Sequence, residues 1–543
     1  MAPSRGTVAA GHPRSAEIAA AVLREGGTAA DATVAGTFAS WVCEPLLTGP
    51  AAGGHLLAVP PDGPALAIDA FCQVPGRRPA DAGERERTAR DPLDGLHAVE
   101  VDFGDAHQVF HVGGASVAAF GLLDGLVRLH ERWGRLPLAD LAAPAAAMAR
   151  EGVVLNRQQA FVADLLHGIL VSSPESAALW APGDLLLREG DLLRDPELGD
   201  TIERLGAEGV APLRDGDLAA ACVDWAARHG GVLTRADLAG YRAVERAPIR
   251  LPYRDRTVLT VPPPSAGGVL LALALARLDR DAARAGGVRA PVAVGRHAED
   301  AEGPSPAELV AAMADADAER TDAFEQGLVR EGFADELLRL RLGSTTHLSV
   351  IDADGLSCAI TTTNGEGSGV IVPGTGIHLN NIMGEEDLNP RLRGGEGSVA
   401  RDLAPFPPGR RMPSMMAPTA VLGPGGPAAA GGPTIGTVEA ILGSAGSARI
   451  RSALLQTVVG LVDRGLGPVG AVEAPRIHVE EGVVYAEPGL LGAVGDWTGG
   501  RTAVEFRAQN LYFGGVQLVA RDPATGVLTG AADPRRGGAV AVA

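Results

Sequence analysis

Residues 344–364 read STTHLSVIDADGLSCAITTTN and change the character of the chain from helical to strand-like. Two β-rich runs flank Asp354-Gly355, and an Asp-Gly dipeptide between such runs is a strong signal for a β-hairpin. If the turn is centred at Ala353–Asp354 or one position to either side, the numbers of paired residues add up to about 707 to 709. The hairpin therefore predicts that Thr345 lies opposite a residue between 362 and 364.

The two ends of this hairpin are rich in hydroxyl groups. A threonine hydroxyl is a poor nucleophile unless a base takes its proton. If the bond between Ser344 and Thr345 is cleaved, the new α-amino group of Thr345, with a reference pKa of about 7.7 to 8, can be that base. Threonine is also common in strands because β-branched side chains suit the pleat, so the hairpin alone leaves a purely structural reading open.

The composition excludes several classes of protein. The formal net charge is −19, which disfavours nucleic acid and anionic membranes as partners. The sequence contains no lysine, so a P-loop lysine, a pyridoxal Schiff base and a Ser–Lys dyad are excluded. With 543 residues, the chain is expected to form two domains or one large multilayer domain.

The cysteines do not predict a metal site, and the apolar segments predict neither a leader peptide nor a membrane helix. The four cysteines are far apart and read as buried thiols, not as a zinc site. Residues 1–14 lack the basic and apolar regions of a leader peptide, and the longest apolar run, Val269 to Ala276, is far shorter than the roughly 20 residues of a membrane helix. We expect a soluble, cytoplasmic protein.

Local patterns predict helices on both sides of the β-rich part. Ser15 is expected to cap a first helix that ends at Gly26-Gly27, and Asp31 to cap a second helix up to Val42. The further expected elements are strands at His55–Val59 and Leu66–Asp69, a helical layer between Ala115 and Glu245, and helices at Pro306–Ala323 and Ala334–Leu342.

Several motifs resemble those of one known family. Thr345 to Val350 is similar to the start of that family's small subunit, and glycine-rich segments follow it. The other matching motifs are Glu25–Ala32, Pro262–Gly268, Gly367–Gly369, Gly374–Ile377, Leu379–Asn381, Ala474–Arg476 and Asp533–Arg535. The chain thus resembles the gamma-glutamyltranspeptidases, N-terminal-nucleophile hydrolases that are made as one precursor, or zymogen, and cut themselves in two.

The resemblance implies an α+β fold, the four-layer αββα sandwich of these hydrolases. Residues 1–344 would form the large subunit and residues 345–543 the small subunit, intertwined in one catalytic domain. The implied activity is that of a gamma-glutamyltransferase or glutathione hydrolase, with a small amide as substrate, water or an amine as acceptor, and neither cofactor nor metal. Its own two fragments would be the only protein partners, with no nucleic acid and no membrane.

Roles for single residues also follow from the resemblance. Thr345 would be the nucleophile for self-cleavage after Ser344 and for turnover, and Thr363 would orient its amino group and hydroxyl. The backbone N–H groups of Gly446 and Ser447 would bind the oxyanion. The implied substrate-binding residues are Phe71, Asn364, Glu385, Ser414 and Met415.

The substrate-binding positions depart from the family pattern. Phe71 stands where the family has an arginine that holds the substrate α-carboxylate by a bidentate contact. Glu385 or Glu386 replaces an aspartate, Met415 replaces the second residue of a Ser-Ser pair, and Ser447 replaces a glycine. Loss of a desolvated bidentate contact strongly weakens recognition of a glutamyl carboxylate.

Three hypotheses therefore remain open. The first is a gamma-glutamyltransferase-like enzyme, and the second is the same chemistry on a different N-acyl or amide substrate. The third is an unprocessed relative that binds a small molecule. His347 is expected to be a structural strand residue, and residues 385–387 to form a solvated loop or an amine-binding patch in preference to a cation site.

Overall fold

A computed structural model of the chain describes residues 4–77, 95–102, 107–284, 303–318, 345–385, 406–424, 436–480, 482–491 and 497–543. The predictions for Ser344, Glu386 and the helix at residues 334–342 lie outside these ranges. Helices and strands both contribute largely to the described part, as expected for an α+β fold.

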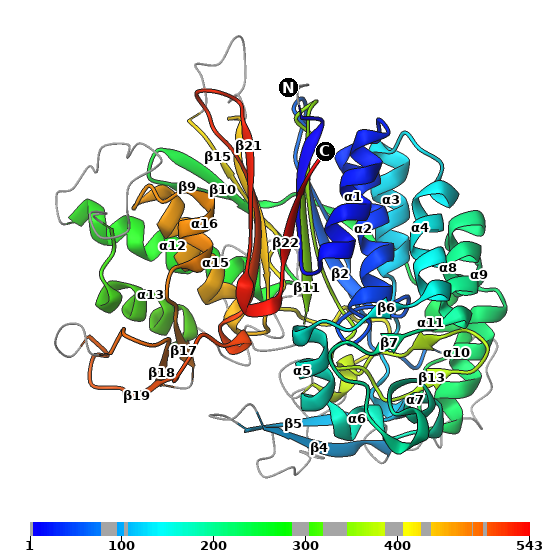
Figure 1. The fold of residues 1–543 in the computed structure, drawn as a ribbon. Coiled ribbons are helices and arrows are strands. Elements are labelled where there is room, and N and C mark those ends of the chain that lie inside the picture. The colour runs from blue at the N-terminus through cyan, green and yellow to red at the C-terminus, as the bar shows by residue number, and fades with distance from the viewer. Residues whose placement is uncertain are drawn as a thin grey trace.

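Two antiparallel sheets form the centre of the molecule (Figure 1). The first has the strand order β22 (Ala539–Val542), β1 (Gly6–Ala10), β11 (Thr346–Asp352), β12 (Ser357–Thr363), β2 (Gly53–Val59), β3 (Leu66–Ala70), β8 (Val244–Arg246). The second has the order β21 (Leu528–Ala532), β20 (Gly515–Arg521), β16 (Val438–Ala445), β15 (Thr419–Leu422), β10 (Arg256–Thr260), β9 (Ile249–Tyr253). The central strands β11 and β12 of the first sheet pack against β16 of the second.

An apolar layer joins the two sheets. Ile351 of β11 and Leu57 of β2 meet Ile441 and Val519 of the second sheet, and all four side chains are fully buried. Because side chains alternate along a strand, the residues of β11 that share the parity of Ile351 face the second sheet. The opposite face of β11, with Leu348 and Val350, belongs to the larger core under the helices.

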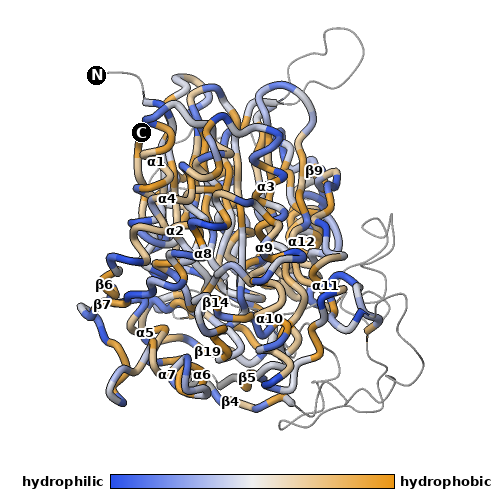
Figure 2. The backbone as a smooth tube through the Cα atoms, turned by 90° about the vertical axis from the view of Figure 1, so that its right-hand side faces the viewer, coloured by the Kyte–Doolittle hydropathy of each residue, from blue (hydrophilic) through white to orange (hydrophobic). Residues whose placement is uncertain are grey.

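Helices cover the outer faces of both sheets. The first sheet is covered by α1 (Pro13–Arg24), α2 (Ala29–Cys43) and α3 (Leu122–Trp133), and α4 (Leu138–Glu151) packs on α2 (Figure 1). The second is covered by α12 (Ala266–Arg284), α15 (Arg449–Val462) and α16 (Pro468–Glu473), and α13 (Pro306–Ala318) packs on α12. Helix α3 and helix α8 (Pro196–Glu208), which packs on α4, carry hydrophilic as well as hydrophobic residues (Figure 2). The hydrophobic side of α3, with Leu122 and Leu126, is buried.

Smaller elements complete the first half of the chain. They are β4 (His97–Asp102), β5 (His107–Val112), β6 (Val153–Val154), α5 (Arg157–Leu165), α6 (His167–Leu170), α7 (Pro174–Trp180), β7 (Leu192–Leu193), α9 (Ala211–Arg214), α10 (Asp217–Arg228) and α11 (Arg235–Ala239). In the second half, β13 (Ile371–Val372), β14 (Ile377–His378), β17 (Ile477–Glu480), β18 (Val483–Ala486) and β19 (Thr502–Glu505) form two small sheets. No helix within the described ranges combines the length and the apolar composition that crossing a membrane requires.

The starts of the first two helices differ from the predicted ones. His12, not Ser15, caps α1, and Ser15 instead contacts Cys43 of α2 at 3.1 Å between Oγ and Sγ. Thr28, not Asp31, caps α2; Asp31 is the third residue of the helix and accepts a hydrogen bond from the Thr28 backbone N–H at 2.9 Å. Both predictions were wrong because residue type alone does not decide which residue caps a helix. Ser15 contacts the neighbouring helix instead, and Asp31 provides the second half of a capping box.

The close packing of the sheets predicts the effect of one added methyl group. A Cβ on Gly443 of β16 would lie 2.2 Å from the ring of His347, which cannot retreat because Thr361 and Ser349 hold it. Gly443→Ala should therefore lower the free energy of unfolding by about 1 to 3 kcal/mol, measured by thermal denaturation. Gly470→Ala on α16, whose Cβ would meet only one atom at 3.7 Å, is the control and should not lower it; equal losses in both would contradict this account.

Candidate active site between the two sheets

The hairpin of β11 and β12 brings Thr345 and Thr363 to the same place. Thr346 pairs with Thr362 and Ile351 with Ser357, so the pair numbers add up to 708, within the predicted range. Thr345 directly precedes β11, and this register places it opposite Thr363. Both threonines are buried, with exposed fractions of 1% and 3%. They have the parity of Ile351 and Ala359, which puts them on the side that faces the second sheet.

A turn of the second sheet provides backbone amide groups on that side. Gly446 and Ser447 connect β16, which packs on β11, to the beginning of α15. Their φ angles are +113° and +68°, so Ser447 is a non-glycine residue in the left-handed region. The turn thus tolerates a side chain where the family pattern has glycine. The amide groups also lie at the positive end of the α15 dipole, which favours negative charge.

Asn364 and Glu385 lie next to Thr363. The backbone N–H of Gly365 donates to Thr363 Oγ1 at 2.8 Å. A Cβ on Gly365 would lie 1.9 Å from Asn381 Oδ1 and 2.9 Å from Glu385 Oε1, so the Glu385 carboxylate is close to this turn. Glu385 is only 3% exposed, which excludes the solvated-loop alternative for this residue. Asn364 is fully buried and donates from Nδ2 to the His378 carbonyl at 3.0 Å.

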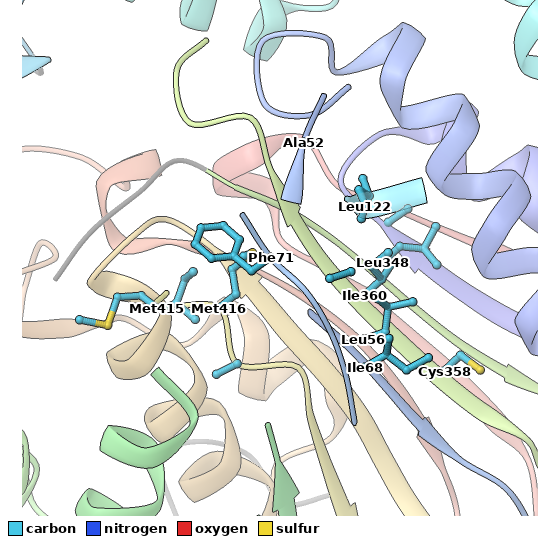
Figure 3. Close-up of a cluster of buried hydrophobic side chains, with 14 of the residues drawn as sticks. Ala52, Leu56, Ile68, Phe71, Leu122, Leu348, Cys358, Ile360, Met415 and Met416 are labelled. Carbon is cyan, nitrogen blue, oxygen red and sulfur yellow. The ribbon is translucent and has the colours of Figure 1, made fainter. Parts of the chain in front are cut away.

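Phe71 forms the side of the site across from Thr363. Thr363 pairs with Gly53 of β2, and the pairing of Gly54 with Ala70 places Phe71 next to Gly53. A Cβ on Gly53 would lie 2.8 Å from Cδ2 of Phe71, so the ring fills the space that this glycine leaves. Phe71 belongs to the same hydrophobic cluster as Met415 (Figure 3).

Two residues that the sequence analysis missed hold Phe71 in place. Its carbonyl accepts hydrogen bonds from Tyr241 Oη at 2.6 Å and from the Arg411 guanidinium. Arg411 is 8% exposed and also lies 3.7 Å from Asp69, which accepts from Arg246 at 2.9 Å. Burial alone raises the pKa of Asp69, but Arg411, with help from His55 and Arg246, lowers it overall. No local sequence signal could have found this arrangement, because it joins residues more than a hundred positions apart.

The segment with Ser414 and Met415 is fixed by its own backbone. The Ser414 hydroxyl accepts from the Met416 N–H at 3.0 Å, and the Ser414 carbonyl accepts from the Ala266 N–H at 2.7 Å. The family motif at residues 262–268 is thereby joined to this segment. The structure places Met415 in the apolar cluster with Phe71, while the Ser414 hydroxyl is engaged locally.

His347 has the structural role expected from strand alternation. Its Nδ1 and Nε2 atoms lie 2.7 Å from Thr361 Oγ1 and 2.9 Å from Ser349 Oγ. Burial lowers the pKa of His347 to about 3, so the imidazole is neutral at physiological pH. The ring is a buried link between strands and does not point to Thr346.

Comparisons with known proteins show which family and which fold the chain is similar to. A family model described as gamma-glutamyltranspeptidase matches residues 15–543. The acylase ACY 1 proenzyme of Pseudomonas sp. (strain SE83) is 32% identical over 97% of this chain and 92% of the relative, and the glutathione hydrolase proenzyme of Escherichia coli (strain K12) is 29% identical over 98% and 90%. The crystal structure of cephalosporin acylase from Bacillus halodurans shares the fold, with a TM-score of 0.74, 24% identity and coverage of 99% and 96%.

The left-handed conformation of Ser447 leads to a prediction about stability. Ser447→Gly should leave the thermal midpoint within about 2 °C of the native one, because glycine relieves strain but is more disordered when unfolded. Ser447→Val should lower the free energy of unfolding by roughly 1 to 2 kcal/mol, because β-branched residues disfavour a positive φ. Equal midpoints for the valine and glycine variants would show that the turn does not have this conformation.

Proposed function

The chain belongs to the gamma-glutamyltranspeptidase family, and we propose that it is a precursor that cleaves itself between Ser344 and Thr345. The observation that carries this proposal is the register of β11 and β12, which brings Thr345 and Thr363 together on the face that packs against β16, the strand before the turn at Gly446-Ser447. The products would be residues 1–344 and 345–543, which stay intertwined because β11 and β12 lie between β1 and β2 in one sheet.

In the proposed self-cleavage, the Thr345 hydroxyl is the attacking group. Its oxygen would attack the Ser344 carbonyl carbon, the C–N bond would break, and the acyl group would pass from nitrogen to oxygen as an ester. Water would then hydrolyse the ester, leaving a carboxylate on Ser344 and a free α-amino group on Thr345. The proton of the hydroxyl moves to the departing nitrogen, so the step is balanced without a cofactor.

Turnover would repeat the same chemistry on an amide substrate. The α-amino group of Thr345 takes the proton of its own hydroxyl, and the oxygen attacks the substrate carbonyl. Thr363 would orient the nucleophile, and the N–H groups of Gly446 and Ser447 would stabilise the tetrahedral oxyanion. The amine leaves with the proton, and water or another amine releases the acyl group from the Thr345 ester.

Support for the finer architecture comes from the order of the packed elements. Helices α1 and α2 pack on one sheet, that sheet packs on the second, and α12 and α15 pack on the other side. This order is what the αββα sandwich of the N-terminal-nucleophile hydrolases requires. We propose this architecture for the chain.

One observation favours a second candidate for the acyl group. The enzyme class is gamma-glutamyltransferase-like, and glutathione hydrolases are among its relatives. However, the ring of Phe71 lies on Gly53 and belongs to the same apolar cluster as Met415, so an apolar ring stands at the sequence position of the family's carboxylate-binding arginine. This favours an acylase-like preference for acyl groups without an α-carboxylate, in line with the acylase relative.

Replacing the nucleophile tests the proposed chemistry. Thr345→Ala should remain one polypeptide and should show no hydrolysis of γ-glutamyl p-nitroanilide above background, because the hydroxyl is the only proposed acceptor of the acyl group. Thr346→Ser is the control and should keep both self-cleavage and turnover. Two fragments from the Thr345→Ala protein would rule out this residue as the attacking group and leave the small-molecule-binding hypothesis or another nucleophile.

Replacing Phe71 tests the acyl preference. The native enzyme should hydrolyse 4-aminobutyryl p-nitroanilide, which lacks the α-carboxylate, at least as well as γ-glutamyl p-nitroanilide. Phe71→Arg should increase kcat/KM for the γ-glutamyl compound about tenfold relative to the other, since a charged hydrogen bond contributes about 1.5 kcal/mol. Phe71→Leu is the apolar control, and a native preference for the γ-glutamyl compound above tenfold would contradict the apolar pocket.

A further inference from the structure

The reverse face of the catalytic hairpin carries a second polar group that the proposed mechanism does not use. Alternation turns Thr346 away from the space between the sheets and toward α2. Its Oγ1 donates to Glu44 Oε1 at 2.8 Å, and Glu44, the residue after α2, is only 2% exposed. A buried carboxyl is thereby hydrogen-bonded to the residue next to the nucleophile.

The surrounding backbone is shaped to admit this hydrogen bond. A Cβ on Gly11 would lie 2.4 Å from Glu44 Oε1 and 2.6 Å from Thr346 Oγ1, so only glycine fits there. A cavity of about 10 Å³ adjoins Glu44 and Thr346, with the hydroxyl groups of Ser15 and Ser40 in its wall. This is the lower limit of the space that one water molecule needs, and apolar side chains such as Leu348 and Ile360 make up most of the wall.

Thr362 repeats the arrangement on the neighbouring strand. It pairs with Thr346, and its Oγ1 lies 3.0 Å from Thr48 Oγ1 and 3.1 Å from the Gly53 carbonyl. The residues adjacent to both catalytic threonines are thus held from behind by hydrogen bonds. The bond to Glu44 differs from the others because it involves a group that can carry charge.

The charges around Glu44 determine how it titrates. Burial raises the pKa of Glu44 to about 7, although the hydrogen bond from Thr346 and the positive charge of Arg536 oppose this rise. Arg536 extends along Gly515, and its Nη2 lies 3.3 Å from the position of a Cβ on Gly446. The neighbouring Cys43 thiol stays uncharged, because burial raises its pKa. Among the described residues, Arg536 is the one whose positive charge acts on Glu44.

We propose that Glu44 is a positioning residue that fixes β11 at the nucleophile and, through its charge, sets the pH at which the α-amino group of Thr345 becomes a free base. The proposal rests on the proposed self-cleavage, which creates this amino group one residue from the Glu44 hydrogen bond. An ionised Glu44 favours the ammonium form, and an uncharged Glu44 favours the free amine. The two groups titrate as a coupled pair near neutral pH.

The sign of the effect is fixed by the charges. In the Glu44→Gln protein, the amide oxygen still accepts from Thr346, but the negative charge is gone and Arg536 stays. The loss of the negative charge lowers the pKa of the amine, because the ammonium form loses a favourable interaction. The acid limb of kcat/KM should therefore move to lower pH by about 0.5 to 1 unit, given an effective dielectric constant between that of the protein surface and water.

The test compares pH profiles of kcat/KM for the p-nitroanilide that the native enzyme cleaves, between pH 5 and 9. Glu439→Gln, which removes a carboxylate 2.7 Å from Arg256 at the other end of β16, is the matched control and should keep the native profile. Thr346→Val, which removes the hydroxyl that binds Glu44, should lower kcat about tenfold with KM unchanged. Thr346→Ser, which keeps a hydroxyl, should have the native kcat. Coincident acid limbs for native and Glu44→Gln enzymes would overturn the proposal.

A second measurement does not depend on activity. The unfolded Glu44 carboxyl titrates near its ordinary pKa of 4.5 and the folded one near 7, so the native protein loses stability as the pH rises between these values. The thermal midpoint of Glu44→Gln relative to native should therefore rise from pH 5 to pH 8. A constant difference would show that Glu44 is not the buried acid described. A native chain that stays uncut would instead overturn the proposed function itself.

Discussion

The antiparallel pairing of β11 with β12 is the constraint on which the rest of the site depends. It fixes a row of residues, Thr345, Thr363, Gly53 and Phe71, across four strand positions of one sheet. A shift of one residue would turn every side chain of the strand to the opposite face and place Thr346 where Thr345 is. The apolar residues Ile351 and Ala359 prevent that shift, because they must stay in the layer between the sheets.

The two faces of the hairpin make different contacts. The inner face carries the threonines toward the turn of the second sheet, and Phe71 and Met415 make one side of the site apolar. The outer face is bound to the helices through Thr346 and Glu44. Under the proposed mechanism, the residues that react and the residues that support them alternate along the same strand.

The sequence predicted those parts that depend on local order. The hairpin and its register followed from Asp354-Gly355 and from the β-rich runs, and the family resemblance identified the glycine-rich turn at Gly446. The strand near Leu66 was also predicted, and it is confirmed as β3. These features arise from turn chemistry and alternation, which neighbouring residues determine.

The parts that could not be predicted depend on contacts between distant segments. Arg411 and Tyr241, from two other parts of the chain, donate hydrogen bonds to the Phe71 carbonyl. Ser15, which was expected to cap α1, contacts Cys43 instead. Glu44 is a single acid after a helix, and nothing in its surrounding sequence indicates that Thr346 would bind it. Burial and pairing are properties of the assembled sheets and not of any one segment.

The intact mass of the purified, denatured chain tests the central claim most directly. The account predicts two polypeptides whose masses add up to the full 55.4 kDa chain plus one water molecule, and a smaller fragment whose first residue is Thr345. A single species of 55.4 kDa after prolonged incubation would contradict it, because the α-amino group that the mechanism requires would never form. Cleavage at any other bond would contradict it equally, since the register places only Thr345 opposite Thr363.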